Sequence, residues 1–281
     1  MQKEVLAMKR KYWLLLFAIA VFLNIGSAMA DDGFYVVAGG GGVGTKITSL
    51  PKIISTPGFY YVTGNLTCSS GNGITVNAID VTIDLMGFCL SGNIASHGIS
   101  GTSNNVEIRN GTLSGWNHAI DMWGTHCRII NLRAQGNAYG INLGTNGGHL
   151  VKGCTVKDNS DTGIFASDST INNNVVSVST VAFYGIVGDG IISGNRVTGL
   201  HKWGISCPGP ANIIGNTVYS SSGGSNGGII LSDVVNVNLP TVLDQNTVYG
   251  PGPHYLGGTS ASFIWAGKST DNKWGSNAGH E

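Results

Sequence analysis

The segment GIVGDGIISGNRVTGLHKWGIS, residues 185–206, contains the pattern that decides the fold. It opens with Gly185-Ile186 and returns to Gly204-Ile205. Between residues 71 and 249 a small residue followed by Ile occurs eight times: Gly73-Ile74, Gly98-Ile99, Ala119-Ile120, Gly140-Ile141, Gly163-Ile164, Gly185-Ile186, Gly204-Ile205 and Gly228-Ile229. Successive steps are 25, 21, 21, 23, 22, 19 and 24 residues apart. A period of this size is typical of a solenoid, in which each repeat forms one coil.

Two apolar columns follow each Gly-Ile step. The first comprises Leu85, Ile108, Ile129, Val151, Ile171, Ile192, Ile213 and Leu243. The second comprises Leu90, Leu113, Ala134, Val156, Val176, Val197, Val218 and Val248. The spacing suits short strands with alternating inward and outward side chains, and no helical period of apolar residues competes with it. We therefore predict an all-β fold, a single-stranded right-handed parallel β-helix of about 8–10 coils with caps at both ends.

The residues between the two apolar columns predict a sharp bend in every coil. Two positions after the first column stand Gly87, Asn110, Asn131, Gly153, Asn173, Gly194, Gly215 and Gln245. Seven of these eight are Gly or Asn, which tolerate a left-handed backbone better than other residues. The next position reads Asn174, Asn195, Asn216 and Asn246 in the last four copies. Stacked amides of this kind are expected to hydrogen-bond from coil to coil.

The first 30 residues have the features of an export signal. Basic residues at 3, 9, 10 and 11 precede the apolar run 12–25, and Ala28-Met29-Ala30 has the form of a signal-peptidase site. An uncleaved anchor is the alternative, but a run of about 14 residues is short for a span of roughly 20. We expect residues 31–63 to form an N-terminal cap, 64–250 the β-helix and 251–281 a C-terminal cap. The protein is then expected to be periplasmic, cell-surface or extracellular, with no stable membrane span after cleavage.

The charge balance argues against nucleic acid as a partner. The chain has 15 basic and 15 acidic residues, and removal of residues 1–30 takes away four basic residues and one acidic residue, leaving 11 against 14. Nucleic-acid backbones are held mainly by Lys and Arg, which here form no broad excess. The Gly-rich run 39–46 matches G-x-G-x-x-G, but no strand–helix–strand unit follows it. No cofactor is therefore expected.

Three segments carry a resemblance to a known family. They are Gly58–Leu66 (GFYYVTGNL), the step Gly73-Ile74, and Val81–Gly92 (VTIDLMGFCLSG). Together with the repeat, over about residues 58–250, they resemble exported bacterial right-handed β-helix repeat proteins with the fold of the pectin-lyase-like superfamily. The resemblance implies the fold. It leaves function open, because that fold serves lyases, hydrolases, epimerases, phage tailspikes and adhesins.

The catalytic sets of the related enzymes are not recognisable in the sequence. Ser96-His97-Gly98 and Asn159-Ser160-Asp161 echo two motifs of polygalacturonase-like hydrolases, but in reversed order, and no Arg-Ile-Lys is present. Inverting hydrolysis needs two facing carboxyl groups, and no such pair is visible. Asp84, Glu107 and Arg128 are expected to share one outward column, in which a Glu107–Arg128 ion pair is the simplest interpretation. Whether the protein is an enzyme stays open, and catalytic residues are unknown.

One column of side chains suggests a binding surface. The residues immediately before the Gly-Ile steps are Asn72, His97, His118, Tyr139, Thr162, Tyr184, Trp203 and Gly227. Stacked coils would bring the rings into a file, and sugar chains stack on aromatic faces of this kind. The candidate substrate-binding residues are Trp116, His118, Asp121, Tyr139, Tyr184, His201 and Trp203, with Asn142 and Ser206 as further hydrogen-bonding groups. The alternative is that the rings only fill the corner between coils.

Metal binding and disulfides receive little support. No His or Cys pair shows close ligand spacing, so no metal site is expected. The five cysteines are Cys68, Cys89, Cys127, Cys154 and Cys207. Cys127 and Cys154 are expected inside the coil. Cys89 is expected outside, where a disulfide to Cys68 is one possibility.

Three hypotheses about function follow from the sequence. The first is an exported β-helix protein that binds a polysaccharide or cell-surface glycan. The second is a polysaccharide lyase or glycoside hydrolase with an unfamiliar site around His97, His118 and Asp121. The third is a structural solenoid of the spike or adhesin type. The sequence leaves the oligomeric state open.

Overall fold

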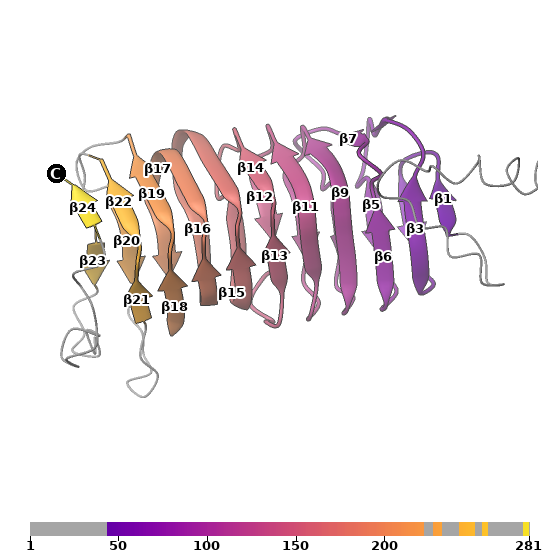
Figure 1. The fold of residues 1–281 in the computed structure, drawn as a ribbon. Coiled ribbons are helices and arrows are strands. Elements are labelled where there is room, and N and C mark those ends of the chain that lie inside the picture. The colour runs from indigo at the N-terminus through magenta and orange to yellow at the C-terminus, as the bar shows by residue number, and fades with distance from the viewer. Residues whose placement is uncertain (1–43, 222–226, 232–241, 251–254, 258–277, 281) are drawn as a thin grey trace, which may run out of the picture. The chain divides into compact units, whose positions relative to one another are not determined.

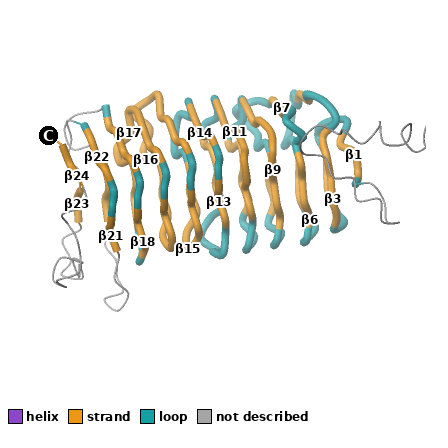
Figure 2. The backbone as a smooth tube through the Cα atoms, viewed as in Figure 1, coloured by secondary structure: helices purple, strands orange, loops and turns teal. Residues whose placement is uncertain are grey.

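A computed structural model of the protein describes residues 44–221, 227–231, 242–250, 255–257 and 278–280. All of them belong to the unit that begins at Gly44. Within these ranges the chain forms strands and turns, and every strand pairing is parallel. Successive strands lie side by side along three ladders (Figures 1 and 2). The protein is thus a right-handed parallel β-helix, as predicted.

The first ladder contains the Gly-Ile steps. Its strands are β2 (Lys52–Ile54), β5 (Ile74–Val76), β8 (Ile99–Gly101), β10 (His118–Met122), β12 (Tyr139–Asn142), β15 (Ile164–Asn172), β16 (Val175–Ser193), β17 (Arg196–Cys207), β20 (Gly227–Leu231) and β23 (Tyr255–Gly257). The paired residues are Lys52, Ile74, Ile99, Ile120, Ile141, Ile164, Ile186, Ile205, Ile229 and Tyr255, in this order. All eight Ile residues of the repeat therefore stack in one register.

The second and third ladders lie on either side of the bend. The second contains β1 (Thr45–Ile47), β3 (Gly58–Val62), β6 (Val81–Asp84), β13 (Leu150–Lys152), β18 (Ala211–Ile214) and β21 (Val242–Asp244). The third contains β4 (Leu66–Thr67), β7 (Cys89–Ser91), β14 (Thr155–Lys157), β19 (Thr217–Ser220), β22 (Thr247–Tyr249) and β24 (Ala278–His280). The long strands β9 (Val106–Ser114) and β11 (Arg128–Gln135) pass through the bend and join both ladders. The strands β15 and β17 likewise take part in two ladders. The longest strand, β16, takes part in all three.

The predicted bend is present in every coil. All eight residues of that column have a left-handed backbone, with φ between 53° at Asn131 and 83° at Gly87. The side chain of the next residue points inward, and the predicted amide ladder is confirmed. The Nδ2 groups of Asn174, Asn195 and Asn216 each donate to the Oδ1 atom of the next Asn, at 3.0, 3.0 and 2.9 Å. Each of these Oδ1 atoms also accepts a backbone N–H from the preceding coil.

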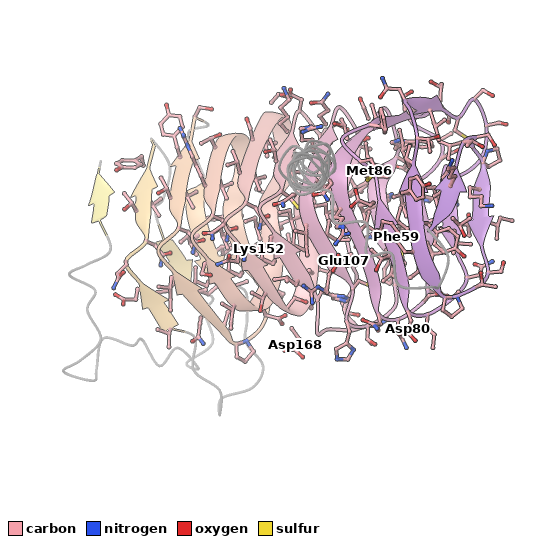
Figure 3. The ribbon with its side chains drawn as sticks, turned by 45° about the vertical axis from the view of Figure 1, so that its right-hand side comes forward. Phe59, Asp80, Met86, Glu107, Lys152 and Asp168 are labelled. Carbon is pink, nitrogen blue, oxygen red and sulfur yellow. The ribbon has the colours of Figure 1, made fainter. Side chains whose placement is uncertain are left out.

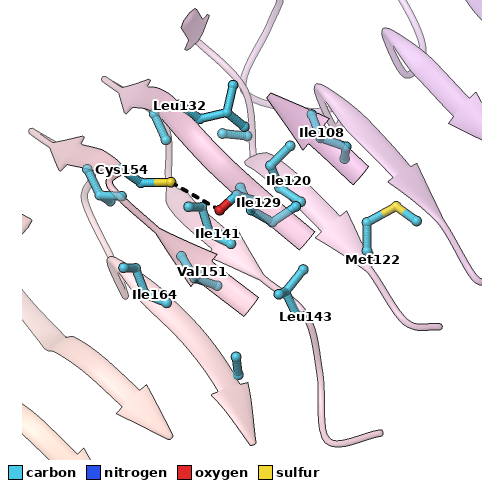
Figure 4. Close-up of a cluster of buried hydrophobic side chains, with 14 of the residues drawn as sticks. Ile108, Ile120, Met122, Ile129, Leu132, Ile141, Leu143, Val151, Cys154 and Ile164 are labelled. Carbon is cyan, nitrogen blue, oxygen red and sulfur yellow. Dashed lines mark hydrogen bonds between the residues drawn. The ribbon is translucent and has the colours of Figure 1, made fainter. Parts of the chain in front are cut away.

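A continuous apolar core fills the coils. Ile108, Ile129 and Val151 are fully buried, as are Leu113 and Val156 of the second apolar column. Figure 4 shows this packing around Ile129, whose carbonyl oxygen accepts from the Sγ atom of Cys154 at 3.6 Å. Burial of each such Ile, Leu or Val contributes about 1.5–3 kcal/mol. The inward positions expected for Cys127 and Cys154 are confirmed.

One prediction for the first copy was wrong. Ile83, not Leu85, pairs with Ile108, because the first bend is two residues longer and includes Met86 and Gly87, both with positive φ. Asp84 consequently pairs with Arg109 and does not share a column with Glu107.

The predicted ion pair of Glu107 is confirmed. Glu107 Oε2 lies 3.1 Å from Arg128 Nε, and Arg109 bridges Glu107 and Asp84 at 2.9 and 2.8 Å. Figure 3 labels Glu107 on the outer surface of the second ladder, between Phe59 and Lys152. The Glu107–Arg128 pair lies on the surface, with a net contribution below about 1 kcal/mol, whereas Asp84 is buried beneath Arg109.

One further expectation needs correction, and one open possibility is not realised. Parallel stacking begins at Thr45, where β1 pairs with β3, well before residue 64. Cys68 and Cys89 are both free thiols. Their separation follows from the register, since Leu66 pairs with Leu90 and thus places Cys89 beside Asn65, three residues before Cys68.

Several expectations fall on residues outside the described ranges. They are the signal sequence 1–30, the part of the N-terminal cap and of the Gly-rich run that precedes residue 44, and most of the C-terminal cap 251–281. Two strands of that cap, β23 and β24, are described, and their backbones continue the first and third ladders. No helix in the described part of the chain has the length and apolar character required to cross a bilayer.

Candidate functional site

A groove on the outer side of the first ladder is the candidate site. It has a volume of about 230 Å³ and opens to solvent on one side. Its lining comes from four consecutive coils and comprises His118, Tyr139, Ile141, Asn142, Thr162, Phe165, Tyr184 and Val187. Three of the seven candidate residues from the sequence, His118, Tyr139 and Tyr184, are therefore brought together.

The ladder register explains how the groove forms. His118 pairs with Tyr139. On the next two coils Ile164 pairs with Ile186, so Thr162 and Tyr184, each two residues before one of these Ile residues, continue the same line. These residues form one wall. The other wall consists of Asn142, Phe165 and Val187. Asn142 pairs with Asp121 on one side and with Phe165 on the other, and Phe165 pairs with Val187. Both walls thus run from coil to coil with the spacing of about 4.8 Å between neighbouring strands.

Glycine in the Gly-Ile steps allows the coils to approach closely. A Cβ atom at Gly163 would lie 2.5 Å from the carbonyl oxygen of Gly185, and one at Gly185 would lie 2.6 Å from the carbonyl oxygen of Gly204. Real Cβ atoms do not make such contacts. The small residue therefore keeps the neighbouring ring positions in register at the groove.

Three rings at one end of the groove are in contact. The ring centroids of His118 and Tyr139 are 4.3 Å apart, with an angle of 7° between the planes. His97 lies on the other side of His118, at 4.8 Å and 43°. The predicted file of rings is thus present over these three coils, and Tyr139 and His118 stay half-exposed.

Two carboxylates are held against the groove lining. Asp121 Oδ1 accepts hydrogen bonds from Asn142 Nδ2 at 2.8 Å and Trp123 Nε1 at 3.1 Å, while its Oδ2 lies 3.7 Å from His97 Nδ1. Asp161 Oδ1 accepts from the backbone N–H of Thr162 at 2.7 Å and from its hydroxyl at 3.0 Å. Asp161 also accepts the phenolic proton of Tyr139 in a hydrogen bond.

These surroundings shift the pKa values of two groove residues. Burial lowers the pKa of His118, an effect that the nearby Asp121 and Asp161 oppose and His97 reinforces. The neutral imidazole is therefore favoured at neutral pH. Burial and the hydrogen bond to Asp161 raise the pKa of Tyr139, so that its phenol stays protonated. The Nδ1 atom of His118 is buried, with no hydrogen-bond partner among the described residues.

Trp116 is not a surface residue, and its assignment to the binding site was wrong. Its side chain is fully buried, and its Nε1 donates to the carbonyl oxygen of Leu90 at 3.1 Å. The indole occupies space left by glycines, since Cβ atoms at Gly92 and Gly73 would collide with it. Trp116 therefore belongs to the core.

Of the remaining two candidates, at the other end of the file, Trp203 does not extend the groove. Trp203 pairs with Tyr184 but is only 4% exposed, so it cannot offer a ring face to a ligand. Here the alternative interpretation, a ring that fills the corner between coils, is correct. His201 pairs with Ala182 in β16, and its side chain lies outside the described part of the structure.

Sequence reasoning missed three residues of the site. Phe165 and Val187 follow the Ile of a Gly-Ile step, the same position as Asp121 and Asn142, so the repeat itself contained the signal. Asp161 was considered only as part of an echoed motif. Its contact with Tyr139 joins neighbouring coils and has no local signature. Within the described residues, no three acidic, His or Cys side chains gather as a metal site would require.

Comparisons with known proteins identify no family for this chain. No protein-family model matches the chain, and no curated protein matches it. Among solved structures, the chain is similar to the crystal structure of Dettilon tailspike protein (gp208), with 12% sequence identity and a TM-score of 0.39. The similarity covers 75% of this chain and 60% of the tailspike chain. Similarity at this level says nothing about function, so the proposals below rest on the geometry of the site.

Proposed function

We propose that this chain is an exported, glycan-binding β-helix protein whose groove on the first ladder holds a polysaccharide. The observation that carries the proposal is the alignment of His118, Tyr139 and Tyr184, which come from different coils and line one open groove. Aromatic faces provide apolar area for the C–H-bearing faces of sugars, while leaving the sugar hydroxyls accessible. An extended chain lying along the coils would meet a ring on successive coils.

The polar groups of the groove suit hydroxyl-rich ligands. Thr162 lies between Tyr139 and Tyr184 on one wall, and Asn142 lies on the opposite wall. Asn142 is already hydrogen-bonded to Asp121 and Thr162 to Asp161, which fixes their orientation. A group fixed before binding loses less conformational entropy when the ligand arrives. These amide and hydroxyl groups would then exchange hydrogen bonds with the ligand's hydroxyls.

The size of the groove favours a segment of a polysaccharide as the ligand over a small molecule that is fully enclosed. Its volume of about 230 Å³ lies below the range of roughly 300–1,000 Å³ typical of pockets that enclose a drug-sized ligand. An open groove of that size holds a short stretch of a polymer whose ends continue into solvent. We propose binding of the glycan and no reaction on it. The sequence resemblance implies the fold of the pectin-lyase-like superfamily.

A titration tests the proposal directly. The purified protein is screened against neutral, aminated and acidic oligosaccharides, and the affinity for each hit is measured by isothermal titration calorimetry. Replacement of Tyr139 and Tyr184 by Ala is expected to weaken binding by about tenfold or more, because two stacking surfaces are lost. Tyr219→Ala is the matched control, since Tyr219 is 47% exposed on β19 of the third ladder. The proposal fails if no oligosaccharide binds, or if the double variant binds as tightly as the parent.

Export is tested separately. Expression of the full chain in a bacterial host is expected to yield a protein outside the cytoplasm whose intact mass corresponds to cleavage after Ala30. Retention of an uncleaved chain in the cytoplasm would contradict this part of the proposal.

A further inference from the structure

The fixed charges beside the groove are acidic. Asp121 and Asp161 are the carboxylates that act electrostatically on His118, and Asp161 also acts on Tyr139. Asp121 is held by Asn142 and Asp161 by Thr162, and both of these partners line the groove. The two acids therefore flank the position of a bound ligand and cannot swing away without losing these bonds.

Among the lining residues that the structure describes, no cation offsets these carboxylates. The eight lining side chains include no Lys or Arg, and the one imidazole among them, that of His118, is kept neutral by burial. His97 Nδ1 lies 3.7 Å from Asp121 Oδ2, and His97 is not part of the lining. Lys202 stands next to Trp203, one coil beyond Tyr184, and is not part of the lining.

We infer from this arrangement, on the basis of the glycan-binding function proposed above, that the groove selects neutral or amino-substituted glycans and rejects polyuronates. A uronate would bring its carboxylate next to Asp121 or Asp161, where the like charges repel. It would find no Arg or Lys in the lining to form the paired hydrogen bonds by which proteins hold carboxylates. A sugar hydroxyl at the same place donates to either acid, and a protonated amine gains from both.

The selectivity is measured with matched pairs of oligosaccharides. The pairs share linkage and length and differ at one carbon: oligomers of glucose against glucuronic acid, galactose against galacturonic acid, and N-acetylglucosamine against glucosamine. Titration of the full-length mature protein at low salt is expected to show at least one neutral or aminated member bound, with its uronate counterpart weaker by about tenfold or more.

Charge-removing variants show whether the two acids cause the selectivity. Asp161→Asn and Asp121→Asn keep an oxygen in the place of each Oδ1 acceptor but remove the charge. In either variant the ratio of affinities between neutral and uronate partners is expected to fall by about threefold or more. Asp80→Asn removes the same charge from an exposed turn outside the groove, at a φ of 56° that Asn tolerates, and should leave the ratio unchanged.

The outcomes separate this inference from the proposed function. A uronate that binds more tightly than its neutral counterpart, with binding still lost on replacement of Tyr139 and Tyr184, overturns the selectivity and leaves glycan binding intact. A ratio that is unaffected by both Asp variants also overturns it. Absence of binding to every oligosaccharide overturns the proposed function and this inference together.

Discussion

The imidazole of His118 lies face to face with the phenol ring of Tyr139, with centroids 4.3 Å apart and the planes 7° from parallel. The two residues are 21 positions apart in the sequence and are direct partners in the first ladder. Their contact shows how the repeat works: one position of the sequence pattern becomes one line of side chains on the surface. The proposed binding groove is such a line.

The Asn ladder is expected to be a major source of stability. Asn195→Ala removes the acceptor of the Asn174 backbone N–H and amide, and leaves the buried carbonyl oxygen of Ile171 without its donor. Each buried polar group left unpaired costs about 1–3 kcal/mol, so we expect a loss of roughly 2–5 kcal/mol in the free energy of unfolding. Urea titration followed by circular dichroism measures this change.

An exposed Asn provides the control for that experiment. Asn212 lies on β18 with its side chain exposed, and Asn212→Ala should change stability by less than about 0.5 kcal/mol. Equal losses for the two variants would show that the ladder has no special role.

The thiols are expected to differ widely in reactivity. Burial raises the pKa of Cys154 to about 11 and that of Cys207 to about 12, so neither forms a thiolate near neutral pH. Cys89 is only half-buried, although burial raises its pKa as well. Alkylation of the native protein at pH 8 should therefore modify Cys89 first, and Cys154 and Cys207 only after unfolding. Mass spectrometry of the unreduced protein should find five thiols, and a peptide linking Cys68 to Cys89 would refute the register around β7.

Stability is expected to fall as the pH drops below the usual His range. Burial lowers the pKa of His149, and the neighbouring His126 adds to this effect. In the unfolded chain His149 has the ordinary His pKa of about 6.5, so below that pH the unfolded chain binds a proton more readily than the folded chain does. The contribution of His149 to stability is thus fully present above pH 6.5 and is lost as the pH falls below it.

A single variant isolates this effect. His149 Nδ1 accepts the backbone N–H of Cys127 at 3.1 Å, and Asn174 Oδ1 accepts the backbone N–H of Cys154 in a bond of the same kind at the bend. His149→Asn should keep this bond without the titrating group. Urea unfolding at pH 7 and pH 5 should then show a smaller pH-dependent loss in the variant than in the parent. Identical losses would rule out His149 as a source.

Much of the fold was predictable because its determinants are local and repeated. A left-handed backbone at Asn131 or Gly194 depends on the residue itself, so the bend column was right in all eight copies. The register of Leu90 with Leu113 was also right, since it follows from equal spacing. Leu85 was misplaced because two extra residues at the first bend shift the alignment without altering the apolar pattern.

The site was less predictable because it depends on contacts between coils. Trp116 is in the core only because Gly73 and Gly92, on other coils, leave room for its indole. The bond between Tyr139 and Asp161 likewise joins positions whose proximity no single repeat reveals. The repeat determines which column a residue belongs to, while neighbouring side chains determine whether it is exposed.

The central claim, that a glycan lies along the groove of the first ladder, is tested most directly by a crystal structure of the protein with a bound oligosaccharide. The account predicts sugar rings stacked on Tyr139 and Tyr184, with hydroxyls near Asn142 and Thr162 and the chain crossing from coil to coil. An oligosaccharide ordered on the second or third ladder, with the groove free of sugar, would contradict it.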